Sequence, residues 1–158
     1  MLMEIERKFL VSGTDWRQDN GINYSQGYLN LDKERTVRVR LTEKQASLCV
    51  KGITKGMSRM EFEYEIPAGD AEQLLKLCEG SVIQKIRYTV IRKGLKWEID
   101  EFLGDNKGLV IAEVELSSED QTFDKPEWLG MEVTTDQRYF NSNLAANPYN
   151  TWRDKNNL

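Results

Sequence analysis

Apolar and charged residues alternate along most of this chain with a period of two, which is typical of β-strands. The segment 58–66 shows the pattern most clearly, because its even positions from 60 to 66 are Met, Phe, Tyr and Ile, whereas its odd positions from 59 to 65 are Arg and Glu. Similar alternation between turn-forming residues predicts strands at 2–11, 23–31, 35–43, 46–54, 58–66, 82–93, 94–102 and 109–117.

Two segments have the apolar spacing of helices instead. In 70–78 the apolar positions 71, 74, 75 and 78 share one helix face, and Gly80 follows as a stop signal. In 136–145 the apolar positions 139, 140 and 144 lie on one side. The segment 126–130 is expected to be a loop anchored by an aromatic residue. About eight strands and two helices predict an antiparallel α+β fold.

The polar side of seven predicted strands consists almost entirely of Glu, Asp, Arg and Lys. An antiparallel sheet with one solvated face also alternates, but such a face usually mixes Thr, Ser, Gln and Lys. The charged positions are Glu4, Glu6 and Lys8, then Arg38 and Arg40, Lys51, Arg59, Glu61, Glu63 and Glu65, Lys85 and Arg87, Lys96, Glu98 and Asp100, and finally Glu113 and Glu115. Their repetition over seven strands favours a functional role for the charged faces.

If the sheet closes into a barrel, one of its two faces lines a lumen. Apolar faces turned inward make an ordinary small barrel with a solvated exterior. Charged faces turned inward make a polar tunnel, whose apolar exterior must be covered by other segments. The two predicted helices and the aromatic-rich loop supply only part of that cover. Alternation alone leaves both arrangements open.

Composition narrows the class of protein. The 158 residues fit a single domain, 1–158, and the net charge of −4 argues against nonspecific nucleic-acid binding. The sequence has no histidine, which excludes Ser-His and Cys-His catalysis and imidazole-bound zinc. Cys49 and Cys78 are too few for a disulfide framework or a thiolate metal site. Without a transmembrane-length apolar run or a signal-peptide pattern, we expect a cytoplasmic protein that does not enter membranes.

A charged lumen has the chemistry of a metal–triphosphate site. Arginine and lysine side chains in such number suit a polyanion, and arginine matches phosphate oxygens bidentately. Pairs of carboxylates two residues apart suit hard divalent cations with oxygen ligands, which predicts Mg²⁺ or Mn²⁺. The sequence contains no P-loop and no kinase glycine loop as a rival phosphate site.

The segment Glu4-Ile5-Glu6-Arg7-Lys8-Phe9 resembles the Glu-x-Glu-x-Lys signature of the CYTH superfamily, also called triphosphate tunnel metalloenzymes. The resemblance continues through charged residues at 38, 40, 51, 59, 61, 63, 85, 87, 98, 100, 113 and 115. The segments 130–134 and 138–145 resemble the closing part of short bacterial members. The resemblance therefore covers nearly the whole chain. It implies an eight-stranded antiparallel barrel, closed around a charged tunnel, with a few covering helices.

The resemblance also implies roles for individual residues. The phosphates are expected to bind Lys8, Arg38, Arg40, Lys51, Arg59, Lys85 and Arg87. The Mg²⁺ or Mn²⁺ ions are expected to bind Glu4, Glu6, Asp100, Glu113 and Glu115. Glu61 and Glu63 are expected near the attacking water or a second metal, with Lys85 as a further catalytic group. The helix at 136–145 is expected to close one mouth of the tunnel.

We expect hydrolysis of inorganic triphosphate, with a carboxylate, a lysine of lowered pKa or a metal-bound hydroxide as proton acceptor. Within the superfamily, the alternatives are a thiamine triphosphatase, an RNA 5′-triphosphatase and a class IV adenylate cyclase that converts ATP to cyclic AMP. Outside it, the alternatives are a non-catalytic binder of phosphorylated ligands and a structural module whose charges form salt bridges. Gln26 and Tyr28 share a strand face, and Tyr28 is interpreted as a packing residue. The tail 147–158 is expected to be disordered or to form an oligomer contact, for example in a homodimer.

Overall fold

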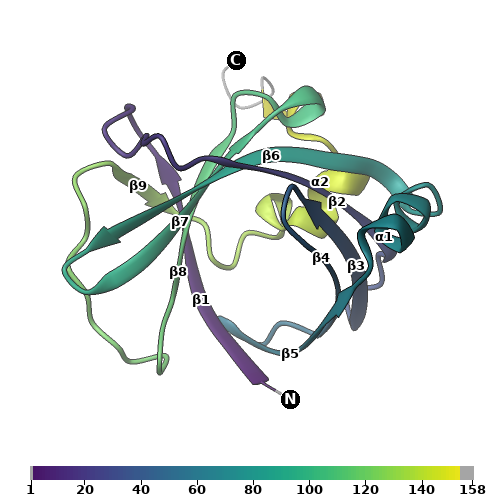
Figure 1. The fold of residues 1–158 in the computed structure, drawn as a ribbon. Coiled ribbons are helices and arrows are strands. Elements are labelled where there is room, and N and C mark those ends of the chain that lie inside the picture. Colours follow the sequence, from purple (N-terminus) through teal and green to yellow (C-terminus); the bar gives the residue numbers. More distant parts are fainter. Residues whose placement is uncertain (1, 154–158) are drawn as a thin grey trace.

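The computed structural model describes residues 2–153, which fold around one closed antiparallel barrel (Figure 1). Its nine-stranded sheet has the order β5-β4-β3-β2-β6-β7-β8-β1-β9, and an additional pairing of β5 with β1 closes it. The strands are β1 (Leu2–Val11), β2 (Ile22–Asn30), β3 (Arg35–Thr42), β4 (Ala46–Gly52), β5 (Ser58–Ile66), β6 (Glu79–Arg92), β7 (Leu95–Phe102), β8 (Val110–Glu115) and β9 (Leu129–Glu132). The expected eight-stranded barrel is confirmed, with β9 as an extra strand.

Strand β1 is the point of closure. One of its edges pairs with β8 from Glu6 to Leu10. Its other edge pairs with β5 from Leu2 to Ile5, and then with β9 at Phe9 and Val11. A single strand therefore joins the two ends of the sheet, and it carries the first charged segment of the sequence into the barrel wall.

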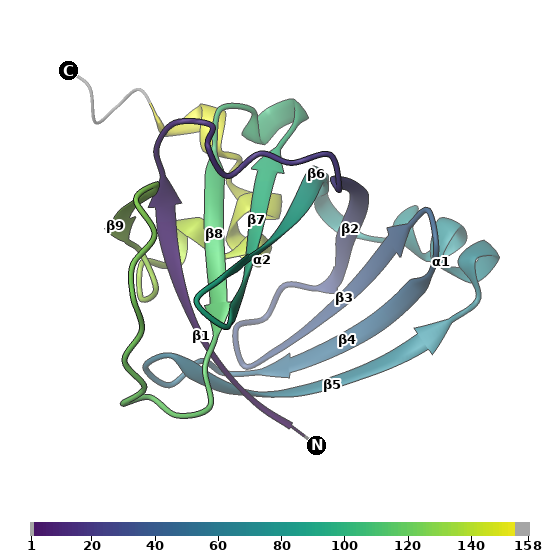
Figure 2. The same cartoon turned by 60° about the vertical axis from the view of Figure 1, so that its left-hand side comes forward.

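The charged faces of the strands point into the lumen, and their apolar faces point outward. Trp16, Phe123 and Trp128, from the segments before β2 and after β8, pack with Phe9 and Trp97 outside the barrel. On another part of the wall, helix α1 (Ala68–Leu75) packs on β2, β3 and β4, and Figure 2 shows it beside the ends of these strands. These covering segments make the inward-charged arrangement possible, because the apolar faces leave water outside the barrel instead of inside.

One end of the lumen is apolar. Lumen-facing side chains there, among them Ile83, Phe102 and Ile111, pack against Leu144 and Ala145 of helix α2 (Asn141–Ala146). At Gly80, where φ is +68°, a Cβ atom would approach the Ala145 carbonyl oxygen to 2.6 Å. Glycine therefore permits the close approach of β6 to α2. The structure places α2 as the plug of this end, as expected from the sequence.

The helices differ from their predicted bounds. The segment predicted as 70–78 forms α1 at 68–75, and Gly80 lies inside β6 instead of ending the helix. The segment predicted as 136–145 is divided into the 3-10 helix η2 (Gln137–Tyr139) and α2, because Phe140 has extended backbone angles. Here the side chain of Asp136 accepts a hydrogen bond from the Arg138 amide and caps η2. Two short elements thus replace the one expected helix.

The remaining short elements lie between the strands and near residue 153. The expected loop at 126–130 ends in β9, while Gly104–Asn106 and Tyr149–Thr151 form the 3-10 helices η1 and η3. The ring of Trp152 packs against Tyr139 and Tyr149, so this part of the tail is held against the folded protein. The expectation of disorder for 154–158 lies outside the described residues. Within the described part of the chain, no helix is long and apolar enough to cross a membrane.

Candidate active site

The charged part of the lumen encloses a cavity of about 380 Å³. All of the residues predicted as site residues line it, with the exception of Asp100, which lies behind Lys85 and Arg87. The lining contains Glu4, Glu6, Lys8, Arg38, Arg40, Lys51, Arg59, Glu61, Glu63, Lys85, Arg87, Glu98, Glu113 and Glu115. Strands that are far apart in the sequence thus bring cations and carboxylates into one chamber.

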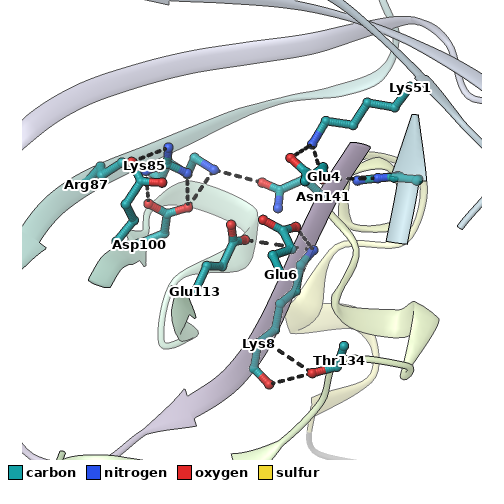
Figure 3. Close-up of polar contacts among 12 residues, drawn as sticks. Glu4, Glu6, Lys8, Lys51, Lys85, Arg87, Asp100, Glu113, Thr134 and Asn141 are labelled. Atoms are coloured by element: carbon teal, nitrogen blue, oxygen red, sulfur yellow. Dashed lines mark hydrogen bonds and ion pairs between the residues drawn. The ribbon is translucent and has the colours of Figure 1, made fainter. Parts of the chain in front are cut away.

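Asp100 holds two of the cations. Arg87 donates from Nε and Nη2 to the two Asp100 carboxylate oxygens at 2.7 and 2.9 Å, and Lys85 Nζ lies 2.7 Å from Oδ2 (Figure 3). Burial raises the pKa of the Asp100 carboxyl, but the charges of Arg87 and Lys85 outweigh this effect and keep the pKa below its ordinary value. Burial and the neighbouring arginines lower the pKa of Lys85 to about 7. Asp100 is therefore ionised and fully engaged by its two partners.

A second group of ion pairs joins β1, β4 and β5. Lys51 Nζ donates to both carboxylate oxygens of Glu4 at 3.0 and 2.9 Å and lies 3.4 Å from Glu61. Arg59 Nε lies 3.4 Å from the same Glu4 carboxylate. Burial alone lowers the pKa of Lys51, but Glu4 and Glu6 outweigh burial and raise it. Glu4 is thus satisfied by cations.

The β1–β8 wall brings like charges together. Glu6 is the cross-strand partner of Glu115, and Glu98 of β7 is the cross-strand partner of Glu113. Lys8 Nζ is 3.7 Å from Glu6 and 3.8 Å from Glu113, so it neutralises this wall only in part (Figure 3). Glutamates directly opposite each other destabilise a sheet unless a cation lies between them. Carboxylate oxygens are the ligand type that hard divalent cations bind.

The arginines of β3 are only partly paired: Arg38 Nη2 lies 3.3 Å from Glu63, but other donors of the two side chains lack anionic partners among the described residues. Arg38 Nε is buried without a hydrogen-bond partner among the described residues. Within the same part of the chain, Arg40 has no carboxylate within 4 Å, and it stacks on Tyr24, whose ring also contacts Arg87. Burial, together with Arg38 and Arg87, lowers the pKa of Arg40 to about 10. These two guanidinium groups are incompletely satisfied by the protein alone, which favours an anion in the cavity.

One acidic group is already assembled. Over residues 2–153, only Cys49, Glu61 and Glu63 place three ligand atoms within 4.8 Å of one another in the way that a metal needs. Burial raises the pKa of the Cys49 thiol, which keeps it protonated and a poor ligand for Mg²⁺. Glu61 and Glu63 remain as a carboxylate pair on the β5 wall.

Several lining residues were not assigned by the sequence. Tyr24 and Tyr28 of β2 line the cavity, but their strand is uncharged, so charge alternation does not reveal them. Gln26 is fully buried on the same face. Asn141 reaches the cavity from α2 and accepts a hydrogen bond from Lys85 at 3.0 Å (Figure 3). In the sequence, only the shared strand face of positions 26 and 28 pointed to these β2 residues, and Tyr24 was missed.

Comparison with known proteins agrees with this geometry. The sequence model of the CYTH domain family matches residues 2–147. An inorganic triphosphatase of Acetivibrio thermocellus is 52% identical over 153 residues, which are 96% of this chain and 98% of the relative. An inorganic triphosphatase of Nitrosomonas europaea is 38% identical over 151 residues, which are 91% of this chain and 97% of the relative. The crystal structure of an inorganic triphosphatase has a TM-score of 0.67 and 35% identity, covering 92% of this chain and 95% of that one.

Proposed function

The chain belongs to the CYTH domain family, and from this premise we propose that it hydrolyses inorganic triphosphate inside the barrel cavity. One observation carries the proposal. Among the described residues, Arg40 has no carboxylate partner, and Arg38 pairs with Glu63 but keeps its buried Nε without a hydrogen bond. Lys8, Lys51, Arg59, Lys85 and Arg87, the other cavity cations except Lys96, are paired with carboxylates. A polyphosphate supplies the missing anionic oxygens, and its several charges match several cations at once.

The substrate is held by cations from opposite walls. Arg38 and Arg40 bind phosphate oxygens from β3, while Lys85 and Arg87 bind them from β6, where Asp100 fixes both side chains. Lys8, Lys51 and Arg59 contact the remaining phosphate oxygens after exchanging part of their contact with glutamates. This distribution of charge orients the phosphate chain and stabilises the charge that develops during phosphoryl transfer.

Mg²⁺ or Mn²⁺ is the proposed cofactor, held by Glu4, Glu6, Glu113 and Glu115. The supporting observation is that Glu6 and Glu115 are cross-strand partners. Like charges placed opposite each other repel, and a bound cation would relieve this. When bound there, the metal supplies charge neutralisation on the triphosphate. We assign Asp100 the role of counter-ion to Lys85 and Arg87 instead, because both its oxygens are engaged.

Water activation is assigned to the β5 wall. Glu61 and Glu63 point into the cavity next to each other, and Glu63 is bound by Arg38 at 3.3 Å. Because the chain has no histidine, a carboxylate of this pair accepts the proton of the attacking water. Lys85 remains a donor that binds the phosphate oxygens.

One assay tests the proposed activity. The purified chain is incubated with Mg²⁺ or Mn²⁺ and with inorganic triphosphate, thiamine triphosphate or ATP, and released phosphate is measured. Cyclic AMP is measured in the ATP sample. Fastest phosphate release from inorganic triphosphate, abolished by a chelator, supports the proposal. Cyclic AMP formation would favour a cyclase, and tight binding without turnover would favour a non-catalytic phosphate binder.

A further inference from the structure

We propose that Gln26 and Asn141 form an amide bridge that orients Lys85 and Arg40 without neutralising either cation, and that this orientation is required for fast turnover. The bridge is a chain of three hydrogen bonds. Lys85 Nζ donates to Asn141 Oδ1 at 3.0 Å, Gln26 Nε2 donates to the same oxygen at 2.8 Å, and Arg40 Nε donates to Gln26 Oε1 at 3.1 Å. The inference rests on the proposed function.

The two amides have only one favourable orientation. If Asn141 were turned over, its NH₂ group would face the Lys85 ammonium, and turning Gln26 over would bring an NH₂ group against Arg40. Gln26 is completely buried, so a lost hydrogen bond could not be replaced by water. The cations therefore fix the amides, and the amides in turn fix the positions of the cations.

For Lys85, the bridge determines the direction of the third N–H bond. An ammonium group has three N–H bonds in tetrahedral arrangement. Asp100 accepts one at 2.7 Å and Asn141 accepts another at 3.0 Å. The direction of the third N–H bond is then fixed by the tetrahedral geometry. This bond is available to a phosphate oxygen in the cavity, which Lys85 lines. Without Asn141 the ammonium could turn around its contact with Asp100.

For Arg40, the bridge is the principal polar contact within the described residues. Gln26 accepts from Nε, while Arg40 Cζ lies over the Tyr24 ring, 4.9 Å from its centroid. These two contacts hold the guanidinium group at Nε and on one face of its plane. The edge formed by Nη1 and Nη2 is left for a bidentate contact with phosphate. A carboxylate in place of Gln26 would compete with the substrate, whereas a neutral amide oxygen does not.

The bridge is anchored to rigid elements. Asn141 is the first residue of α2, whose Leu144 and Ala145 are buried in the apolar end of the lumen. Gln26 lies in the middle of β2, paired with both β3 and β6. The plug helix therefore contributes a positioning residue to the site as well as closing the lumen.

The kinetic test uses Asn141→Ala and Gln26→Leu, with Asn143→Ala and Gln84→Ala as matched controls. Asn143 is on the same helix and Gln84 is exposed on β6, and neither contacts a cavity cation. We expect each bridge variant to lower kcat for inorganic triphosphate about 10- to 100-fold, with KM changed less than about 3-fold. The charges that bind the substrate remain, but their alignment in the transition state is lost. A raised KM with unchanged kcat would overturn the proposal.

A double variant and a conservative variant separate positioning from packing. If the two amides act as one unit, Gln26→Leu with Asn141→Ala should lower kcat no more than the worse single variant. If the double variant instead lowered kcat by the product of the two single effects, the proposal that the amides act as one bridge would be wrong. Asn141→Asp keeps the acceptor oxygen but adds a negative charge beside Lys85, so kcat should recover toward the wild-type value while KM rises about 10-fold. An Asp variant as slow as Asn141→Ala would contradict the positioning role.

A readout independent of turnover is calorimetric binding of inorganic triphosphate in the presence of a chelator, together with thermal unfolding. Single bridge variants should bind within about 3-fold of wild type. If they bind far more weakly, or lose activity only in proportion to their unfolded fraction, the positioning role is wrong. Failure of the proposed function has a different signature, because the wild-type chain itself would then release no phosphate.

Discussion

Lys85 Nζ and Asp100 Oδ2 lie 2.7 Å apart, and both side chains are 1% exposed. Arg87 binds the same carboxylate through two nitrogens. One buried anion thus holds two of the cations that we assign to phosphate binding, and burial with adjacent arginines brings the pKa of Lys85 to about 7. Asp100 therefore affects both the stability of the barrel and the positions of two cations in the cavity.

Replacing Asp100 by Asn should destabilise the fold, because Lys85 and Arg87 then lose their buried counter-ion. We expect a loss of about 3–5 kcal/mol in the free energy of unfolding, measured by urea denaturation without metal. The control is Glu101→Gln, which removes an exposed ion pair with Arg17 and should cost at most about 1 kcal/mol. If the Asp100→Asn protein were as stable as this control, the counter-ion role would be wrong and Asp100 would again be a candidate metal ligand.

Replacing Arg40 by Met should weaken the binding of inorganic triphosphate but change the stability of the protein little. The variant removes a partly buried cation without a carboxylate partner, which favours the folded state, but it also leaves the buried Gln26 Oε1 without its donor. The two effects oppose each other, so stability should change by no more than about 1 kcal/mol. Binding of inorganic triphosphate should weaken about 10- to 100-fold, which corresponds to the loss of a charged hydrogen-bond pair. Calorimetry measures the binding, with Arg92→Met as an exposed control. Unchanged binding would remove Arg40 from the phosphate site.

Replacing Glu115 by Gln should separate metal dependence from folding. Glu115 faces Glu6 across the β1–β8 ladder, so the neutral side chain should leave the metal-free protein equally stable, or more stable by up to about 1 kcal/mol. Activity at low Mg²⁺ or Mn²⁺ should fall about 100-fold or more and recover in part as metal is added. Glu72→Gln on α1 is the control. If Glu115→Gln had full activity and needed no more metal than wild type, Glu115 would be excluded as a ligand.

The pair of Arg7 and Glu132 should make stability depend on acid pH. The hydrogen bond with Arg7 lowers the pKa of Glu132 below its ordinary value of 4.5. Its stabilising contribution is therefore complete above that value and is lost as pH falls through the lowered pKa of the folded state. Both side chains are partly exposed, so the effect should be only about 0.5 kcal/mol. Urea unfolding of wild type and Glu132→Gln should differ at about pH 6 and converge near about pH 2.

The positions of the strands and the membership of the charged face could be predicted from local pattern, because a period of two is a property of each strand alone. Glu4, Lys8, Arg38 and Lys85 were identified in this way, and they all line the cavity. The short strand β9 was missed because Leu129–Glu132 contains a glycine and is too short to show alternation. The expected helix at 136–145 is interrupted at Phe140, whose ring contacts Lys8 in the folded protein.

The sequence by itself determined which residues share a face, and through its family resemblance it indicated what that face does. Tertiary structure decided the rest, since alternation is the same whether the charges point inward or outward. The β1–β5 pairing closes the barrel, and its apolar outer face is covered by Trp16, Phe123 and Trp128. The charged faces therefore point into the lumen. Which cation meets which anion depends on contacts between distant strands. Asp100 consequently holds Lys85 and Arg87, while Arg40 is left to Gln26 and the substrate, and no local pattern contains that information.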